Sequence, residues 1–252
     1  MSDVFRLDGK LSLVTGASRG IGAAIAKALA RQGSDVLLLA RDIQKMEAVA
    51  RDIRAMGRNV KFFQVDLADI KQLNDFLESE KKTFEKLDNF INNAAFTIYK
   101  SFMQSSLQDL DSLITVNVKG AISLVQKAAE YMVKRGRGTI TFITSINALS
   151  ALPSQAMYSS TKAMLESLMK SSASELARQG VRVNSVVPGA IKTDMNPHFT
   201  PEKIKDLEKL IPCGRVGEPE EIADVVAFLC SDAARYIYGS SVTADGGMLL
   251  RK

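Results

Sequence analysis

The stretch Thr15-Gly16-Ala17-Ser18-Arg19-Gly20-Ile21-Gly22 decides the fold, because it joins a short apolar run to a longer helical pattern. Its glycines permit a tight turn and let backbone N–H groups approach a pyrophosphate, while the positive end of the following helix attracts the anion. A glycine-rich turn alone is a weak signal, but its position between a strand and a helix strengthens it. The stretch therefore predicts a phosphate-binding turn at the start of a βαβ unit.

The same alternation of short apolar runs and longer amphipathic patterns continues along the chain. It predicts one doubly wound α/β domain over residues 1–252, with a seven-stranded parallel sheet covered by helices on both faces. The expected strands are Leu11–Thr15, Asp35–Ala40, Val60–Val65, Asn89–Asn92, Thr139–Thr144, Arg182–Val186 and Ser241–Ala244. The expected helices are about Gly20–Gln32, Ile43–Met56, Ile70–Phe84, Leu107–Val133, Tyr158–Arg178 and Pro219–Leu229.

One segment interrupts this rhythm. From about Asp194 to Gly214 the chain contains prolines and only a short helical pattern. Long irregular segments in compact domains are often binding loops or lids. We therefore expect residues 194–214 to close over a substrate.

Composition excludes several classes of protein. The 252 residues are 46% hydrophobic and 24% charged, as in an ordinary globular chain. Two cysteines without CxxC spacing, Cys213 and Cys230, and the single histidine His198 cannot supply a structural zinc site, so no metal is expected. The net charge of +5 is scattered among acidic residues, which disfavours a nucleic-acid partner and suits an anionic cofactor. No signal-peptide pattern and no membrane-length apolar run is present, so we expect a cytoplasmic protein without a membrane partner.

The end of the second expected strand indicates which coenzyme is bound. NAD-binding domains tend to place an acidic residue there, which bonds the ribose 2′-hydroxyl. In this chain the position is Ala40, followed by Arg41, and Arg19 lies within the glycine-rich turn. Two cations and no carboxylate favour NADP(H). The alternative is that both arginines are solvated surface charges.

A candidate acid/base pair lies in the expected helix that begins near residue 158. Tyr158 and Lys162 are spaced i, i+4, so they share one helix face, and an adjacent ammonium favours the phenolate. Pairs with this spacing also arise by chance, so the signal is weak alone. Ser145 strengthens it, because we expect it at the end of the fifth strand, where open α/β sheets bind their ligands.

Taken together, these motifs resemble those of the short-chain dehydrogenases/reductases over essentially the whole chain. The matching segments are Thr15–Gly22, Asp66, Asn92-Asn93-Ala94, Asn117, Ser145, Tyr158 with Lys162, Pro188-Gly189 with Thr193, and Ala244–Gly247. The resemblance implies a Rossmann domain. The chain departs from the family pattern at Ala95, where glycine is usual, and the added methyl group could crowd the adenosine ribose.

The resemblance also implies a role for each matching side chain. Ser145 would polarise the substrate oxygen, and Tyr158 would exchange the proton. Lys162 would bind the nicotinamide ribose and lower the tyrosine pKa, while Asn117 would support a water molecule. The implied cofactor-binding residues are Gly16, Ser18, Arg19, Gly20, Ile21, Gly22, Arg41, Asp66, Leu67, Asn93, Ala94, Tyr158, Lys162, Pro188, Gly189, Ile191 and Thr193. The candidate substrate contacts are Ser145, Asn147, Gln155, Tyr158 and Met195.

The expected function is an NADP(H)-dependent oxidoreductase that interconverts a carbonyl and a secondary alcohol on a small molecule. Some segments resemble sugar-oxidising glucose dehydrogenases, although residues 146–157 are less polar than a sugar pocket should be. A 3-oxoacyl-carrier-protein reductase is the alternative enzyme, but those usually carry arginine where Glu130 stands. A non-catalytic NADP(H)-binding sensor is the alternative of a different class. The long helices at 107–133 and 158–178, through which family members pair, also predict a homotetramer.

Overall fold

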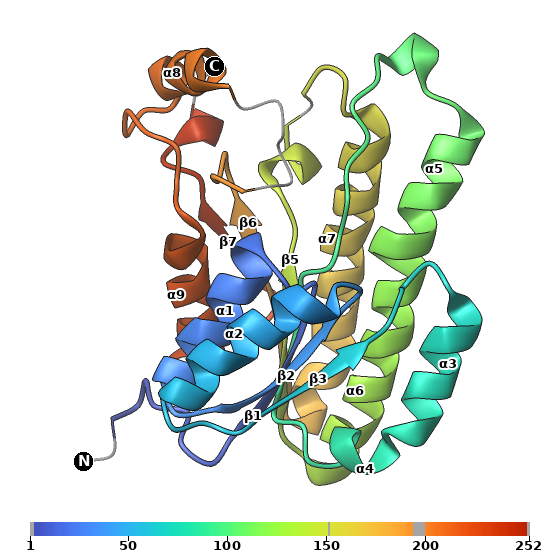
Figure 1. The fold of residues 1–252 in the computed structure, drawn as a ribbon, viewed down its shortest axis with the longest axis vertical. Helices are drawn as coiled ribbons and strands as arrows, with labels where there is room; N and C mark the ends of the chain where they lie inside the picture. Colours follow the sequence, from blue (N-terminus) through green and yellow to red (C-terminus); the bar gives the residue numbers. More distant parts are fainter. Residues whose placement is uncertain (1–2, 151, 194–199, 251–252) are drawn as a thin grey trace.

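The computed structural model describes residues 3–150, 152–193 and 200–250, and its centre is a parallel sheet (Figure 1). The strands are β1 (Leu11–Thr15), β2 (Asp35–Ala40), β3 (Val60–Gln64), β4 (Asn89–Asn92), β5 (Gly138–Ile143), β6 (Val181–Pro188) and β7 (Ser241–Ala244). They pair in the order β3-β2-β1-β4-β5-β6-β7, and every pair is parallel. The chain order reverses between β1 and β4, which is the point where open α/β sheets bind ligands. The expected seven-stranded doubly wound fold is confirmed.

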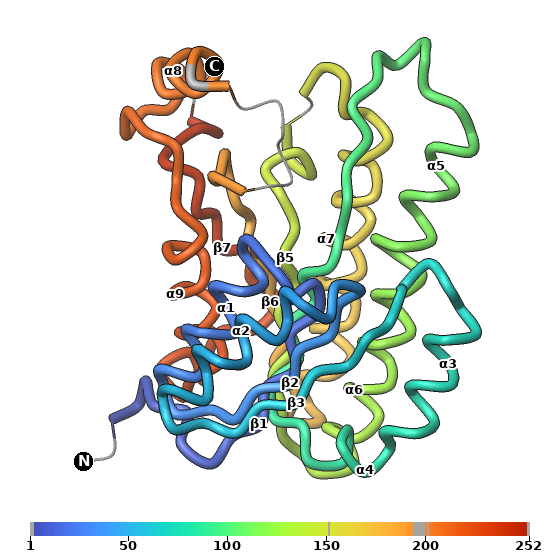
Figure 2. The backbone as a smooth tube through the Cα atoms, in the orientation of Figure 1, coloured from blue at the N-terminus to red at the C-terminus, as the bar shows by residue number. Residues whose placement is uncertain are grey.

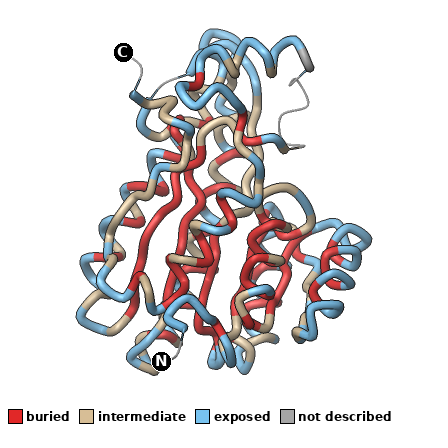
Figure 3. Tube along the Cα trace, turned by 90° about the vertical axis from the view of Figure 1, so that its left-hand side faces the viewer, coloured by how far each residue is buried: buried red, intermediate tan, exposed pale blue. Residues whose placement is uncertain are grey.

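Helices cover both faces of this sheet. They are α1 (Gly20–Arg31), α2 (Ile43–Ala55), α3 (Ile70–Ser79), α4 (Lys81–Phe84), α5 (Leu107–Ile114), α6 (Ala121–Arg135), α7 (Ala156–Leu176), α8 (Pro201–Leu210) and α9 (Pro219–Cys230). One core cluster packs α1, α2 and α9 on the sheet, and a second packs α3, α4, α6 and α7 on the opposite face. Figure 3 shows the strands buried between these layers. Burial on both faces explains why the strands are continuous apolar runs.

Two expected helices differ from the prediction in the structure. The expected helix Ile70–Phe84 breaks at Glu80, between α3 and α4. The expected helix Leu107–Val133 contains a wider π-helical turn, η2 (Thr115–Gly120), between α5 and α6. The prediction of an uninterrupted helix was therefore wrong for Ile70–Phe84, whereas the chain stays helical from Leu107 to Arg135 and the outer limits of both were close. The π-helical turn contains Asn117, whose tertiary contact is described below.

The strand positions were predicted closely, with one difference that bears on the site. β5 ends at Ile143, so Ser145 lies two residues beyond the strand instead of at its end. There it begins the short 3₁₀ turn η3 (Ile146–Ala148), and its hydroxyl accepts the N–H of Asn147 at 3.2 Å. Ser145 is therefore held by a turn rather than by the sheet ladder.

The carboxyl ends of the strands point toward the end of the molecule where α8 and the loop that connects β4 to α5 lie. Figure 2 traces both of these segments at the same end of the molecule. Across the described ranges, no helix has the length and apolar character needed to span a membrane. The same residues contain no group of three His, Cys, Asp or Glu side chains that could hold a metal ion.

Candidate active site

The glycine-rich turn packs tightly against the residues that follow β4. A Cβ on Gly16 would lie 2.9 Å from Cα of Ala94, and one on Gly22 would lie 2.3 Å from the carbonyl oxygen of Gly16. Thr15 Oγ1 accepts the N–H groups of Asn93 and Ala94, each at 2.9 Å. Any side chain larger than hydrogen would push these segments apart. The spacing of the glycines thus follows from this close approach.

One cavity of about 1310 Å³ extends from this turn to the predicted acid/base pair. It is larger than the roughly 300–1,000 Å³ of pockets for drug-sized ligands, so it has room for a dinucleotide together with a small substrate. Every residue predicted to bind the cofactor lines it. Ser145, Asn147, Gln155 and Tyr158 line it as well, whereas Met195 and His198 lie outside the described residues.

The end of β2 brings several charges to this cavity. Arg41 is 70% exposed, and its Nη1 lies 3.8 Å from Oδ2 of Asp66. Arg19, Ala40 and Lys45 also line the cavity. Lys45, which was not predicted, lies in the first turn of α2, four residues after Arg41. Three cations and the N-terminus of α1 therefore border one part of the cavity, and they fit a phosphate-bearing cofactor.

Tyr158 and Lys162 lie one turn apart on α7 and are both buried, at 8% and 2% exposure. Lys162 Nζ donates to the carbonyl oxygen of Ile143 at 2.9 Å and lies 5.7 Å from the Tyr158 ring centroid. Ser145, from the turn after β5, hydrogen-bonds to Tyr158. The three side chains predicted from spacing are thus brought together at the carboxyl edge of the sheet.

Burial controls the ionisation of this pair. It raises the pKa of Tyr158 above the ordinary tyrosine value, and the hydrogen bond with Ser145 opposes the rise. Burial also lowers the pKa of Lys162 to about 8, against the opposing charge of Glu166. Desolvation is the largest cause of the raised Tyr158 pKa, and Lys162 is not among the groups that shift it. A tyrosine that holds its proton suits the role of proton donor.

Asn117 is fully buried and does not line the cavity. Its Oδ1 accepts the N–H of Phe96 at 3.0 Å, and its Nδ2 donates to the Phe96 carbonyl oxygen at 3.0 Å. Nδ2 also contacts Thr161 Oγ1 at 3.2 Å. Asn117 therefore joins the loop after β4 to α7, immediately before Lys162.

The loop after β4 and the segment between η3 and α7 line the cavity near Tyr158. Asn147 donates to the side-chain oxygen of Gln155, and the Gln155 side chain also hydrogen-bonds to Tyr99. Lys100 donates its backbone N–H to the carbonyl oxygen of Ser154 at 3.0 Å. Ser154 has φ of +63°, a left-handed conformation that is uncommon for a residue with a side chain and that clusters at functional sites. Tyr99 was missed from the sequence, where nothing but its position after Asn92-Asn93-Ala94 marks it.

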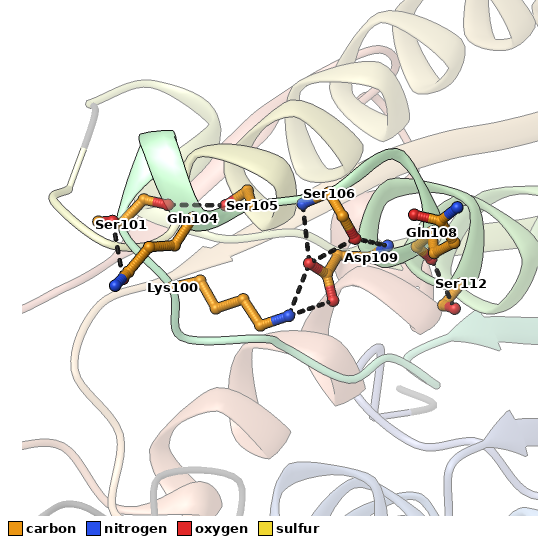
Figure 4. Close-up of polar contacts among 8 residues, drawn as sticks. All are labelled: Lys100, Ser101, Gln104, Ser105, Ser106, Gln108, Asp109 and Ser112. Atoms are coloured by element: carbon orange, nitrogen blue, oxygen red, sulfur yellow. Dashed lines mark hydrogen bonds and ion pairs between the residues drawn. The ribbon is translucent and has the colours of Figure 1, made fainter.

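The loop after β4 is also fastened at the start of α5 (Figure 4). Ser106 and Asp109 form a capping box, in which each side chain hydrogen-bonds to the other's backbone N–H. Lys100 Nζ lies 2.8 Å from both carboxylate oxygens of Asp109. Asp109 thus holds the loop that carries Tyr99.

Comparison with known proteins shows which family this chain resembles. A family model described as "Enoyl-(Acyl carrier protein) reductase" matches residues 16–249. A 3-oxoacyl-(acyl-carrier-protein) reductase of Aquifex aeolicus is 38% identical over 96% of this chain and 98% of its own length. An L-rhamnose 1-dehydrogenase (NAD(P)(+)) of Sphingomonas is also 38% identical, over 96% of this chain and 97% of its own.

Solved structures agree with these relatives. A gluconate 5-dehydrogenase from Burkholderia cenocepacia, in complex with NADP and tartrate, superposes with a TM-score of 0.93 at 30% identity, over 99% of both chains. A putative NAD(P)-dependent gluconate 5-dehydrogenase from Beutenbergia cavernae reaches 0.94 at 32% identity, over 99% of this chain and 100% of its own. The chain therefore belongs to the short-chain dehydrogenase/reductase family and is an oxidoreductase that acts on alcohol and carbonyl groups.

Proposed function

We propose that this chain reduces a ketone or aldehyde with NADPH, and in the reverse direction oxidises a secondary alcohol with NADP⁺. The observation that carries the proposal is the convergence of Ser145, Tyr158 and Lys162 on the cavity that begins at the glycine-rich turn. A dinucleotide coenzyme bound along that cavity from the glycine-rich turn would place its nicotinamide end beside these three side chains. The cations Arg19, Arg41 and Lys45 support NADP(H) over NAD(H).

Each side chain then has a defined task. The coenzyme, when bound, supplies the hydride to the carbonyl carbon. Ser145 Oγ hydrogen-bonds to the carbonyl oxygen and holds it near Tyr158. Tyr158 Oη donates its proton to that oxygen as negative charge develops there, which yields the alcohol and leaves a phenolate. The Lys162 ammonium stabilises the phenolate and binds the nicotinamide ribose.

The substrate is a small neutral or weakly polar molecule in this proposal. Phe96, Tyr99, Leu152, Pro153 and Met248 line the described part of the cavity beyond Tyr158. The amide groups of Asn147 and Gln155 face the same space and can orient a hydroxyl or a second carbonyl. Leu207 of α8 also lines it, so α8 belongs to the proposed lid.

The test is a panel of purified substrates. NADPH consumption is followed with ketones, diketones, aldehydes and acyl thioesters, and NADP⁺ reduction with sugars and secondary alcohols. Turnover of any carbonyl or alcohol supports the proposal. Tight NADPH binding without turnover of any compound would instead favour the non-catalytic sensor.

A 3-oxoacyl-carrier-protein reductase is a second candidate, which the 38% identity to the Aquifex aeolicus reductase favours. Glu130 stands where those enzymes usually have arginine, but Lys127 and Lys134 pair with it at 3.3 and 2.6 Å. These two lysines also give the face a positive charge that an acidic carrier could meet. The candidate requires that a carrier-bound 3-oxoacyl thioester has a higher kcat/KM than the same acyl group on a small thiol.

The proposal also covers the oligomeric state of the protein and its location in the cell. We propose a homotetramer built on α5, α6 and α7, with Leu107 and Met164 among the exposed apolar side chains on these helices. The two cysteines are free, which suits a reducing compartment such as the cytoplasm.

A further inference from the structure

A carboxylate that the proposed mechanism does not use lies buried beneath the catalytic helix. Glu166, on α7, is only 4% exposed. A buried carboxylate is costly unless hydrogen bonds or an opposite charge compensate it. Because the sequence places Glu166 on a long helix, it would ordinarily be taken for a solvated surface charge. Its burial therefore requires groups that compensate the cost of removing the carboxylate from water.

Three hydroxyl groups, two from strands and one from the residue after a strand, surround this carboxylate. Thr144 and Ser185 lie 2.5 and 2.8 Å from Oε1, and Ser241 lies 2.6 Å from Oε2. Ser185 and Ser241 are register partners on β6 and β7, while Thr144 follows β5. Hydrogen bonds from a hydroxyl to an ionised carboxylate are typically about 2.5–2.7 Å long. The Thr144 and Ser241 distances fall in this range and the Ser185 distance is slightly longer, so all three hydroxyls donate to the Glu166 carboxylate.

The carboxylate reaches the catalytic residues by two routes. Thr144 directly precedes Ser145, so its hydrogen bond to Glu166 fixes the end of β5 from which Ser145 projects. Lys162 lies one helical turn before Glu166, and the two charges attract one another. The other titratable groups near this centre are Tyr158 on α7 and Tyr99 on the loop after β4. Among the described residues, the hydrogen-bond partners of the Glu166 carboxylate are the hydroxyls of Thr144, Ser185 and Ser241.

We propose that Glu166 is a positioning residue for the reaction: it anchors the Thr144–Ser145 segment and supplies the buried anionic partner of Lys162. The proposal rests on the proposed roles of Ser145, Tyr158 and Lys162. The attraction of Glu166 opposes the lowering of the Lys162 pKa by burial, which leaves that pKa at about 8. Glu166 thereby keeps the ammonium present through the neutral range.

Glu166→Gln tests the charge without removing the hydrogen-bonding shape, because the amide oxygen can accept from Thr144 and Ser185. Without the negative charge the pKa of Lys162 falls, so the alkaline limb of the pH profile for carbonyl reduction should move down by about one pH unit. Glu175→Gln is the matched control, since Glu175 is an exposed residue of the same helix. It makes the same substitution and should leave the limb where it is in the unaltered protein.

A second measurement needs no substrate. Because Lys162 contacts the cofactor in the proposed mechanism, NADPH affinity should fall as Lys162 loses its proton, and Glu166→Gln should shift the midpoint of that fall to lower pH. If no carbonyl is turned over, the proposed function fails while this binding curve still decides the role of Glu166. Should the Gln variant not fold, Glu166→Asp withdraws the carboxylate and should shift both curves in the same direction by less. An alkaline limb and a binding midpoint that stay in place, in whichever variant folds, would overturn the proposal.

Discussion

Asn117 and Phe96 are joined by a pair of hydrogen bonds, in which the side-chain amide of one both accepts from and donates to the backbone of the other at 3.0 Å. This pairing turns the Asn117 side chain toward the loop after β4. It coincides with the π-helical turn Thr115–Gly120, which gives the chain an extra residue between α5 and α6. Asn117 thus orders the loop that borders the cavity, without being exposed to the cavity itself.

We predict that Asn117→Asp destabilises the protein strongly. An oxygen would replace the Nδ2 donor and face the Phe96 carbonyl oxygen, in a site that is 0% exposed. The free energy of unfolding should fall by about 3 kcal/mol, the upper range for leaving a buried polar group unsatisfied. Denaturant titration measures the change, with Asn74→Asp on the exposed face of α3 as the control. Equal stability of the two variants would contradict the structural role.

This contact shows where sequence analysis reaches its limit. The strands were located closely because burial on both faces leaves a continuous apolar run that needs no knowledge of neighbours. The π-helical turn at Thr115–Gly120 could not be located from the sequence. Phe96, the hydrogen-bond partner of Asn117 in that turn, lies 21 residues away in the chain. Glu166 was missed for the same reason. Its hydroxyl partners come from three separate segments, and nothing local distinguishes it from a surface glutamate.

Tyr158→Phe should abolish turnover while NADPH binding remains nearly unchanged. The variant removes only the hydroxyl that donates the proton, a contribution of about 10²–10⁴-fold for a general acid. Steady-state kinetics gives kcat, and fluorescence titration gives the dissociation constant of NADPH. A Phe variant with more than about a tenth of the original kcat would exclude Tyr158 as the proton donor.

The ion pair of Lys100 with Asp109 should make stability depend on pH in the acid range. The hydrogen bonds of Lys100 and Ser106 lower the pKa of Asp109 to about 2, below its ordinary value of 3.8. A lowered pKa stabilises the folded state above pH 3.8, and this contribution is lost as the pH falls toward 2. Asp109→Asn should therefore lower Tm at neutral pH, and its difference from the unaltered protein should shrink on acidification.

Asp111→Asn provides the matched control for this prediction, because Asp111 is an exposed residue of the same helix. Calorimetry from about pH 7 down to the lowest pH at which the protein stays folded records both variants. If Asp109→Asn and Asp111→Asn follow the same curve, the ion pair does not stabilise the loop.

The proposed tetramer predicts a mass near four times that of the 27.4 kDa chain in solution. Leu107 and Met164 are exposed on α5 and α7, at 73% and 45%. Burial of such apolar groups is the main driving force for association. Light scattering at micromolar concentration measures the mass. Leu107→Asp should shift the population toward smaller species, whereas a monomeric mass for the unaltered chain would eliminate the proposed assembly.

The coenzyme preference is the prediction that depends most directly on the end of β2. A carboxylate at position 40 would repel the 2′-phosphate of NADP(H), and Ala40 avoids this repulsion. Arg41 is 70% exposed, and its 3.8 Å distance to Asp66 leaves it only weakly held. It can therefore turn toward a phosphate, and Arg19 lines the same part of the cavity. Each charge-assisted hydrogen bond contributes about 1.5–3 kcal/mol, so two arginines can support a preference of about 10²–10³.

The double variant Ala40→Asp with Arg41→Ala should consequently shift kcat/KM toward NAD(H), through repulsion as well as lost attraction. Arg41→Ala alone separates the two effects, because it removes the attraction and leaves position 40 neutral. Its kcat/KM should fall with NADPH and stay unchanged with NADH. Kinetics with both coenzymes decides the matter for all three proteins. If the unaltered chain uses NADH as well as NADPH, or if the double variant keeps its preference, the arginines do not recognise the phosphate.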